Sequence, residues 1–449
     1  MKQYRYIYSI GKKGLPPLKG NTLFLDIETT GFSRETTFLT IIGLAWQEDD
    51  KIVIEQWLNE CSQPETDSAS VQDQSLSQDA KVEFHPETEK SRDLWSLLED
   101  ASMVKPSSYQ PAHSAFQVKT NFLHSKKHSR HLPPPLSMKE RGFLEEKLLL
   151  NTLEDFLQNY EKLPTLIHYN GTTFDLPYLK AKYEQYGLTS SLSDCSSLDL
   201  YRYAKKYKNF LHPGGLKQKN MEEVFGLFRE DTLSGEELIQ TYEKGIQQSN
   251  KRLLDLYLLH NKEDMEGMVF LQNLLQLDQV FDGDFTIEKW DENKDLSSLF
   301  VKLSFPLCLN RSLSLDLCGI HLHMEGNDLF LKIPVNNLEA KYFYPDYKNY
   351  YYLPLEDRAI HKSVASFVEK EFRKKATKET CYMKKTASFY PLPLPSKKKQ
   401  QKECLEKCCL LQLFYQEFGD TKAYLLCSSL HDSQCKKQYI KALLLAFLE

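Results

Sequence analysis

Between residues 21 and 59, the hydrophobic positions follow the short, dense pattern of β-strands. Residues 22–29 (TLFLDIET) and 36–46 (TTFLTIIGLAW) are apolar runs rich in β-branched and aromatic side chains. Residues 51–59 (KIVIEQWLN) instead alternate between polar and apolar positions. Runs of both kinds are typical of strands. We therefore predict three successive strands in this part of the chain.

The composition changes sharply after the third predicted strand. From about residue 61 to about residue 140 the chain is rich in Ser, Gln, Asp, Lys and His, and only residues 91–100 (SRDLWSLLED) keep an apolar helical pattern. A segment of this composition buries too little apolar surface to offset its conformational entropy. We predict a largely disordered, low-complexity insertion at about 61–140.

Beyond the insertion, hydrophobic positions recur with helical spacing and are separated by short strand-like runs. The order is helix, strand, helix, a short strand running into a helix, and then further helices. These elements are expected at residues 145–163, 164–170, 171–188, 196–207, 212–226, 234–245 and 250–277. Ser234 and Glu237 have the spacing of a capping box at one helix start. Together with the three strands, this order predicts an α/β fold with a mixed sheet and flanking helices.

A second change of pattern begins near residue 279. Runs between residues 300 and 344 have the pattern of short strands, with residues 325–328 (EGND) as a hairpin turn. A Tyr-rich stretch then leads into a helical pattern over residues 359–376, and a Leu- and Cys-rich helix ends the sequence. These changes predict an N-terminal leader (1–20), an α/β domain (21–278) and an accessory module of short strands then helices (279–449).

Composition and charge narrow the class of protein. Hydrophobic residues make up 41% of the 449 residues and the net charge is −5, so the chain can form a sizeable core and is not markedly basic. It has no run of about 18 apolar residues for a membrane span, and its start, MKQYRYIYSI, lacks the apolar segment of a signal peptide. The ten cysteines show no CxxC spacing. We expect a cytoplasmic protein that does not enter a membrane.

Two acidic residues interrupt the first predicted strand. Asp26 and Glu28 are two residues apart, so their side chains project from one face of a strand. Neighbouring carboxylates repel one another unless they are protonated or bridged by cations. Hard divalent ions such as Mg²⁺ and Mn²⁺ favour oxygen ligands of this kind. The pair is a weak signal by itself, and it gains weight only if further ligands are found.

Two further polar clusters lie farther along the chain. Asp175 follows the strand that ends at Asn170 and Gly171, and it is either a helix-capping residue or an acid at the edge of an α/β site. His260 and Asp264 are four residues apart, which places them on one face of a helix. A structural role alone also explains such a pair.

Taken in order, the three clusters resemble the motifs of the DEDD family of 3′–5′ exonucleases. They read LDIETTG (25–31), HYNGTTFD (168–175) and HNKEDMEGM (260–268). Within that family the chain is most similar to the bacterial YprB-type ribonuclease H-like proteins, on the stretches YNGTTFDLPYL and DLYRYAKKYKNFLHPGGLK. The resemblance covers residue 21 to about 277 without the insertion, and it implies an RNase H-like fold.

The resemblance also implies the roles of individual residues. Asp26, Glu28, Asp175 and Asp264 would hold two divalent ions, Mg²⁺ or Mn²⁺, and His260 would orient or deprotonate the attacking water. The chain departs from both subtypes of the family at this base. The histidine subtype has four residues between the base and the last Asp, and the tyrosine subtype has three. His260 is therefore a histidine at the tyrosine spacing.

Five residues are candidates for substrate binding, and each has a structural alternative. Thr29 belongs to the turn after the first strand. Tyr169 and Phe174 would either stack on a terminal base or fill the core. Asn170 would line the site or complete a turn, and Lys217 would either steady a phosphate or lie on the surface as an ordinary lysine.

The resulting prediction is a metal-dependent 3′–5′ exonuclease that hydrolyses phosphodiester bonds of DNA or RNA. One alternative is a catalytically weak nucleic-acid-binding protein that retains the exonuclease fold. Another is a structural protein that binds a protein partner, whose identity the sequence leaves open. The basic stretches at 366–379 and 396–402 are compatible with contact to a nucleic-acid backbone and equally with a solvated surface.

Overall fold

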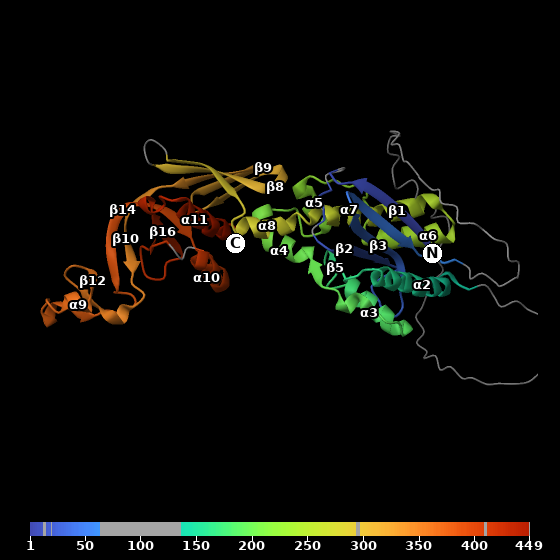
Figure 1. Ribbon diagram of the computed structural model, residues 1–449, viewed down its shortest axis with the longest axis horizontal. Coiled ribbons are helices and arrows are strands. Elements are labelled where there is room, and N and C mark those ends of the chain that lie inside the picture. The colour runs from blue at the N-terminus through green and yellow to red at the C-terminus, as the bar shows by residue number, and fades with distance from the viewer. Residues whose placement is uncertain (12–14, 19, 63–135, 293–296, 408–410, 449) are drawn as a thin grey trace, which may run out of the picture. The chain divides into compact units, whose positions relative to one another are not determined.

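The computed structural model in Figure 1 describes residues 1–11, 15–18, 20–62, 136–292, 297–407 and 411–448. The predicted insertion, with its helical pattern at 91–100, lies almost entirely outside the described residues. Helix α2 begins at Met138, which lies within the C-terminal end of the predicted insertion. The helix therefore starts earlier than the hydrophobic pattern of the sequence indicated. The cause is a capping box, because Ser137 and Glu140 satisfy each other's backbone N–H groups.

A six-stranded mixed sheet forms the centre of the N-terminal half. Its strands lie in the order β1-β4-β3-β2-β5-β6. Strands β1, β4, β3 and β2 pair antiparallel, whereas β2, β5 and β6 pair parallel. Their bounds are Lys2–Ser9 (β1), Thr22–Thr29 (β2), Leu39–Glu48 (β3), Lys51–Leu58 (β4), Thr165–His168 (β5) and Ser197–Asp199 (β6). The predicted mixed sheet is confirmed.

Strand β1 corrects the predicted N-terminal leader. Lys2–Ser9 pairs with β4 along its whole length and forms one edge of the sheet. Tyr4, Tyr6 and Tyr8 recur with a period of two and lie half-buried on one face of this strand. This part of the chain is therefore an integral part of the sheet.

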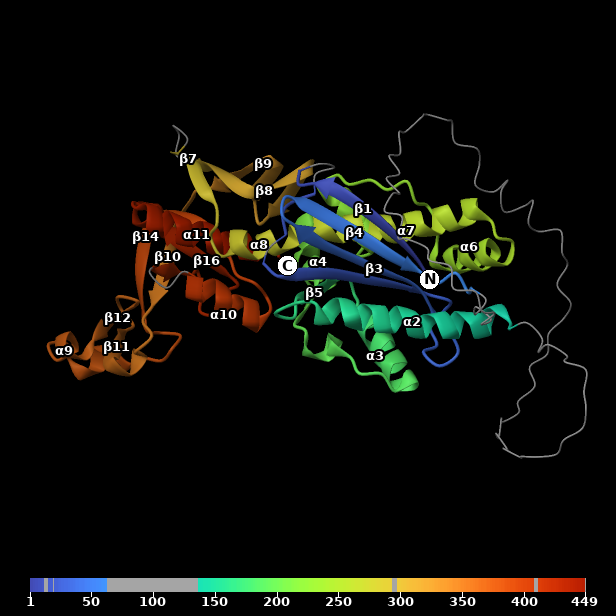
Figure 2. The same cartoon turned by 45° about the vertical axis from the view of Figure 1, so that its right-hand side comes forward.

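Helices cover both faces of the sheet (Figures 1 and 2). Leu23 and Leu25 of β2 pack with α2 and α3 on one face, whereas Phe24 packs with α4, α5 and α7 on the other. Since side chains alternate along a strand, Asp26 and Glu28 share the face of Phe24 and α7. The helices are α2 (Met138–Gln158), α3 (Asp175–Tyr186), η2 (Ser191–Asp194), α4 (Leu200–Leu211), α5 (Gln218–Phe225), α6 (Gly235–Gln247), α7 (Lys251–Leu271) and α8 (Leu274–Phe281).

The C-terminal part contains three small sheets and short helices. The sheets have the strand orders β7-β8-β9, β10-β14-β16-β15 and β12-β11-β13. The strands are Thr286–Glu292 (β7), Ser298–Leu317 (β8), Ile320–Pro334 (β9), Asn336–Phe343 (β10), Tyr350–Leu353 (β11), Arg358–His361 (β12), Lys374–Lys375 (β13), Tyr382–Pro393 (β14), Leu413–Phe414 (β15) and Lys422–Leu426 (β16). The helices are η3 (Tyr347–Asn349), α9 (Lys362–Ala365), η4 (Lys370–Phe372), α10 (Lys398–Lys407), η5 (Cys427–Ser429) and α11 (Ser433–Ala446).

Two predictions for this region are wrong. The hairpin between β8 and β9 turns at Cys318 and Gly319, because both have positive φ angles of 53° and 81°. Residues 325–328 instead lie within β9. The helical pattern over 359–376 yields only β12, the four-residue α9, η4 and β13, because pairing with the tyrosine-rich strand β11 takes both ends of the segment.

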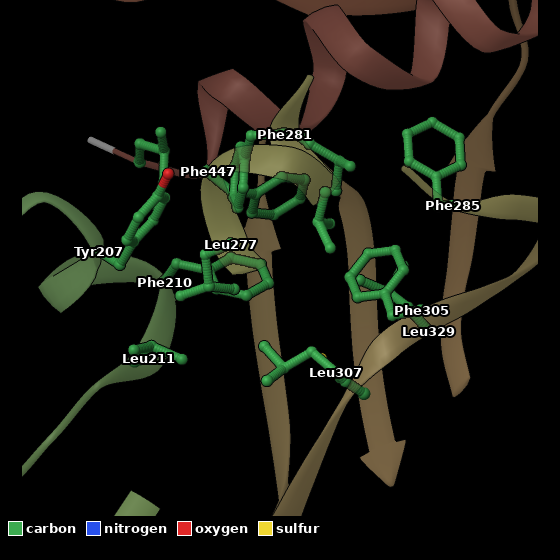
Figure 3. Packing of buried hydrophobic residues seen from close by; sticks show 14 of the residues in the cluster. Tyr207, Phe210, Leu211, Leu277, Phe281, Phe285, Phe305, Leu307, Leu329 and Phe447 are labelled. Carbon is green, nitrogen blue, oxygen red and sulfur yellow. The ribbon is translucent and has the colours of Figure 1, made fainter. Parts of the chain in front are cut away.

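One buried apolar cluster links the helices of the N-terminal half with the C-terminal sheets (Figure 3). The ring of Phe281 in α8 lies 5.2 Å from Tyr207 and 5.3 Å from Phe210 in α4. Leu307 of β8 and Phe447, which follows α11, belong to the same cluster. Helix α8 thus crosses the predicted boundary at residue 278, and the division into two domains stays a prediction. Among the described residues, no helix is long and apolar enough to span a membrane.

Candidate active site

Asp26 and Glu28 project from the central strand β2 toward helix α7. Asn261 of α7 is completely buried, and its Nδ2 donates a hydrogen bond of 2.7 Å to Oδ2 of Asp26. Gln56 of β4 donates in turn to Oδ1 of Asn261, at 2.8 Å. The strand has a register shift between Glu28 and Thr29, where it leaves regular pairing with β3. The two predicted metal ligands therefore lie near the end of a central strand, and the first is oriented by a buried amide.

Gly43 makes room for this arrangement. It lies opposite Asp26 in the neighbouring strand β3. A Cβ atom at this position would be 2.5 Å from Oδ1 of Asn261, which is closer than real Cβ contacts. Only glycine therefore allows Asn261 to sit against the sheet and reach Asp26.

Asp175 is buried in the first turn of α3, and its role in the site stays a prediction. The N-cap residue of α3 is Phe174, which makes no side-chain capping bond, so Asp175 is not the cap. A Cβ atom on Gly171 would lie 2.8 Å from Oδ2 of Asp175. The turn before it includes Asn170, with a φ angle of 63°. The left-handed Asn170 and the small Gly171 together bring the chain close around this carboxylate.

Helix α7 adds an imidazole and a further carboxylate. Nε2 of His260 lies 3.2 Å from Oδ2 of Asp264 and 3.6 Å from Oε1 of Glu28. These three residues each offer one ligand atom, and the three atoms lie within 4.8 Å of one another. His260 and Asp264 lie side by side, as their spacing of four residues on a helix predicted. The structure also brings this third cluster close to Glu28 of the first cluster.

Asp26, Glu28 and Asp175 have raised pKa values. Burial, together with the charges of Asp264, Glu28 and Asp175, raises the pKa of Asp26 well above its usual range. Burial also raises the pKa of Glu28 to about 8, although the positive charge of His260 opposes this shift. The pKa of Asp175 is raised to about 7, again mainly by burial. Burial and mutual repulsion disfavour the charged forms of these oxygen ligands, and a bound divalent cation would favour them.

Two charged residues of the loop between α5 and α6 complete the cluster, and sequence reasoning missed both. Nη1 of Arg229 lies 2.8 Å from Oδ1 of Asp264. Oδ2 of Asp231 lies 2.7 Å from Nδ1 of His260. The carboxylate of Glu263 accepts the backbone N–H groups of Glu230 and Asp231, at 3.0 and 2.9 Å. Three neighbouring residues of α7 therefore hold this loop in place.

Arg229 also neutralises a second, deeply buried acid. Its Nε and Nη2 atoms donate to Glu222, which is completely buried, at 2.6 Å each. A Cβ atom on Gly267 would lie 1.8 Å from Oε1 of Glu222, so this glycine of α7 admits the carboxylate. The paired acids raise the pKa of Arg229 above its ordinary value against the opposing effect of burial. The guanidinium is therefore a fixed positive charge between two acids.

The pKa of His260 is higher than the ordinary value of about 6.5 on which its predicted role as a base at neutral pH rests. Burial lowers the pKa of the imidazole, but the hydrogen bond to Asp231 and the charges of Asp264 and Glu28 outweigh it and raise the pKa to about 9. The hydrogen bond to His260 conversely helps to hold the pKa of Asp231 below its usual value, against the opposing effect of burial. As the cluster stands, His260 is a cation at neutral pH.

Four of the five predicted substrate-binding residues have internal partners. Oγ1 of Thr29 donates to the carbonyl of Gly31 at 2.7 Å, the hydroxyl of Tyr169 donates to the carbonyl of Leu216 at 2.7 Å, and the N–H of Asn170 donates to Asp199 at 2.8 Å. The ring of Phe174 lies 5.8 Å from Phe32. Lys217 is exposed at the start of α5. Their roles in binding stay predictions.

Phe32 is an aromatic side chain that sequence reasoning did not single out. It follows the turn after β2 and is 84% exposed. The signal that would have indicated it is its place directly after LDIETTG, where a large apolar residue has no core to fill. Arg229 and Asp231 gave no comparable signal, because they lie in a loop without periodic spacing.

A family model described as the RNase_H superfamily matches residues 23–87 and 128–276. This part of the chain has an RNase H-like fold. The match includes all five residues of the acidic and histidine cluster, leaves out residues 88–127, and ends near α8. It indicates a nuclease-type activity on nucleic acid. No curated protein matches the chain.

Proposed function

We propose that this protein is a metal-dependent 3′–5′ exonuclease that hydrolyses phosphodiester bonds of DNA or RNA. The observation that carries the proposal is the convergence of Glu28, His260 and Asp264 within 4.8 Å. The negative charge of Asp264 also contributes to the raised pKa values of Asp26 and Asp175. The RNase H-like fold supports the nuclease class. The 3′–5′ direction rests on the resemblance of the three motifs to the DEDD exonucleases.

Asp26, Glu28, Asp175 and Asp264 would hold two Mg²⁺ or Mn²⁺ ions. The donor set fits this role, because hard oxygen ligands crowd together and the pKa values of Asp26, Glu28 and Asp175 are raised. When bound, such ions stabilise the charge on the attacking and leaving oxygens of a phosphoryl displacement. Asn261 would hold Asp26 in the orientation that binding needs.

His260 would orient the attacking water and accept its proton. Asp231 receives the hydrogen bond of Nδ1, so the other ring nitrogen, Nε2, faces the cluster. The charges of Asp264 and Glu28 contribute to its raised pKa. Both residues are proposed ligands, so compensation of their charge would lower the pKa of His260 toward the range of a neutral-pH base.

The exposed Phe32 and its neighbour Phe174 would offer a stacking surface for a base of the substrate. Lys217 would contact a phosphate. Thr29, Tyr169 and Asn170 would shape the wall of the site through their internal hydrogen bonds.

The experiment that tests the proposal is digestion of 5′-labelled single-stranded DNA and RNA with Mg²⁺ or Mn²⁺. We expect a ladder that shortens from the 3′ end and disappears in Asp26→Ala and in Asp175→Ala. The exposed variant Lys147→Ala is the matched control and should retain the activity. Cleavage that persists in Asp26→Ala would contradict the assignment of the site.

A second candidate function is nucleic-acid binding with slow or no turnover. The observation that favours it is the ion pair of Arg229 with Asp264, in which Nη1 lies 2.8 Å from Oδ1. An internal cation at a proposed metal ligand competes with an ion for that charge. Binding of single-stranded DNA without any ladder in the digestion experiment would support this second function.

A further inference from the structure

Residues 362–378 of the C-terminal part form a surface that is both basic and aromatic, which we call the basic–aromatic surface. It comprises α9, η4, β13 and the residues between and directly after them. The segment has six basic and two acidic residues, a net charge of +4, whereas the whole chain has a net charge of −5. The positive charge is therefore concentrated here against an acidic background.

Three large apolar side chains of this surface lie in solvent. Val364, Phe367 and Phe372 are 57%, 90% and 44% exposed. Phe367 is among the most exposed large hydrophobic residues in the described part of the chain. Side chains of this size gain stability only when they are covered, so a group of them beside lysines indicates an interaction surface.

The folding of the small sheet β12-β11-β13 does not use these side chains. Its core consists of Ala359, Ala376 and Cys381, against which tyrosines pack. Tyr344 and Tyr350 stack at 4.5 Å. Tyrosine side chains thus pack against the core of the small sheet, whereas the phenylalanines of the basic–aromatic surface lie outside this core.

Asp357 anchors the same small sheet by polar contacts. It accepts hydrogen bonds from the hydroxyls of Tyr352 and Tyr382 and pairs with Lys384. These contacts connect the turn between β11 and β12 to β14. Lys374 and Lys375 contribute to the small sheet through the backbone of β13, whereas these polar contacts do not involve the side chains of Phe367 or of the lysines of 362–378.

The lysines of the surface are available to a ligand. Lys362, Lys370, Lys374 and Lys375 are exposed, and among the described residues none of them forms an ion pair. Arg373 differs, because its Nη1 donates to the carbonyl of Ala365 and its guanidinium lies over a tyrosine ring. Arg373 therefore stabilises the local fold, and the lysines supply the free charge.

We propose that the basic–aromatic surface binds single-stranded nucleic acid, with its lysines on phosphates and Phe367 stacked on a base. Basic side chains interleaved with exposed aromatic rings are the combination that binds single strands. The four-residue α9 is too short to lie on a membrane as an amphipathic helix. The inference rests on the proposed function, since it makes the bound strand a substrate of the same protein.

The test measures binding by the full chain in an Asp26→Asn/Asp175→Asn background without added metal, so that no strand is cut. The probes are a 5′-fluorescein-labelled single strand and a duplex of the same sequence. Lys374→Ala/Lys375→Ala should weaken binding roughly 10- to 30-fold at about 0.1 M salt and reduce the slope of log K against log salt by about 1.4, since two phosphate contacts are lost. Phe367→Ala should weaken single-strand binding about fivefold or more and change duplex binding little.

Control variants test whether the loss of strand binding is specific to the basic–aromatic surface. They remove similar charge or apolar surface at other exposed positions. Lys147→Ala/Lys289→Ala removes two exposed lysines elsewhere, and Leu355→Ala removes a side chain that is 82% exposed in the turn between β11 and β12. Both should bind as the parent does. Circular dichroism and melting temperatures should show that all the variants are folded.

A separate assay distinguishes failure of this inference from failure of the proposed function. It measures cleavage of a trinucleotide with Mn²⁺ by the parent protein, which keeps Asp26 and Asp175. Strand binding that depends on Lys374, Lys375 and Phe367 supports the inference even if no trinucleotide is cut, and only the proposed function then fails. Unchanged strand binding in these variants overturns the inference, whatever the cleavage result. Loss of binding to phosphatidylserine vesicles or to an acidic polypeptide, with strand binding unchanged, likewise overturns it.

Discussion

Arg229 and Asp264 form a contact of 2.8 Å between Nη1 and Oδ1. The other oxygen of the same carboxylate lies 3.2 Å from Nε2 of His260. Asp264, a proposed metal ligand, therefore lies between a guanidinium and an imidazole. Each of its two carboxylate oxygens has one of these groups as a partner, which fixes the orientation of the carboxylate. The loop that supplies Arg229 also supplies Asp231 to the imidazole, so one short segment positions both functional residues of α7.

Arg229→Ala should destabilise the protein strongly. The substitution leaves Glu222, which is completely buried, without its bidentate partner, and breaking a buried ion pair costs about 3–5 kcal/mol. Urea denaturation measures the loss. The exposed Arg252→Ala is the control and should change the free energy of unfolding by less than about 0.5 kcal/mol. Equal stability of the two variants would show that the pairing is unimportant.

Asp231→Asn should lower the pKa of His260 from its value of about 9, because the hydrogen bond to a charged acceptor is among the causes that raise it. NMR titration of the imidazole measures the change. Activity should fall about 10- to 100-fold, as it does when an orienting partner is lost. Lys262 lies two residues farther along the same helix and pairs with Glu266, so Lys262→Ala is the control and should leave the titration unchanged. A His260 pKa that is the same in Asp231→Asn and in the parent would rule out the orienting role.

Gly43→Ala should disturb Asp26 from the neighbouring strand. The added Cβ would lie 2.5 Å from Oδ1 of Asn261 and displace the amide that orients Asp26. We expect a loss of about 1–3 kcal/mol in stability together with weaker Mn²⁺ binding. Gly235→Ala in α6 is the matched control, because nothing lies within 4 Å of its added Cβ, and it should be neutral or stabilising by up to about 1 kcal/mol. Mn²⁺ binding by Gly43→Ala as tight as that of the parent would contradict the proposed role of Asn261 in orienting Asp26.

The stability of the metal-free protein should fall as the pH rises from about 5 to 9. The folded-state pKa values of Asp175, about 7, and Glu28, about 8, exceed the unfolded values near 4. Their contribution to stability is therefore complete below pH ~4 and is lost as the pH rises through 7 to 8. His260, raised to about 9 from an ordinary value near 6.5, acts in the same direction at higher pH.

Divalent ions should reverse this loss, because they bind the deprotonated carboxylates. Mn²⁺ should raise the melting temperature more at pH 8 than at pH 5.5, and Asp26→Asn/Asp175→Asn should abolish the difference. Differential scanning fluorimetry measures the shift. A shift of the same size at both pH values, or one that survives in the double variant, would contradict the role of these acids.

Patterns with a fixed period predicted most of the cluster. The alternation along β2 places Asp26 and Glu28 on one face, and the spacing of four residues in α7 places His260 beside Asp264. Their approach to Asp175 was implied by the resemblance of the motifs, because it depends on contacts between segments far apart in the chain. Arg229 and Asp231 lie in a loop without a repeat, and their partners are fixed only by tertiary packing.

Two segments fold differently from the elements predicted for them. The apolar positions of residues 359–376 have helical spacing, but pairing with β11 at both ends leaves α9 with four residues. Strand β1 was assigned to a leader although its tyrosines alternate as in a strand. Strands β1, β12 and β13 all lie at sheet edges, where pairing with a neighbouring strand decides the structure.

The number of Mn²⁺ ions bound per chain tests the central claim most directly. Isothermal titration calorimetry and electron paramagnetic resonance at pH 8 should give two ions for the parent protein. Asp26→Asn should bind fewer ions or bind them at least tenfold more weakly, while Lys147→Ala should bind two. Parent protein that binds no Mn²⁺, or Asp26→Asn that binds as many ions as tightly as the parent, would contradict the proposal that these acids form a two-metal site.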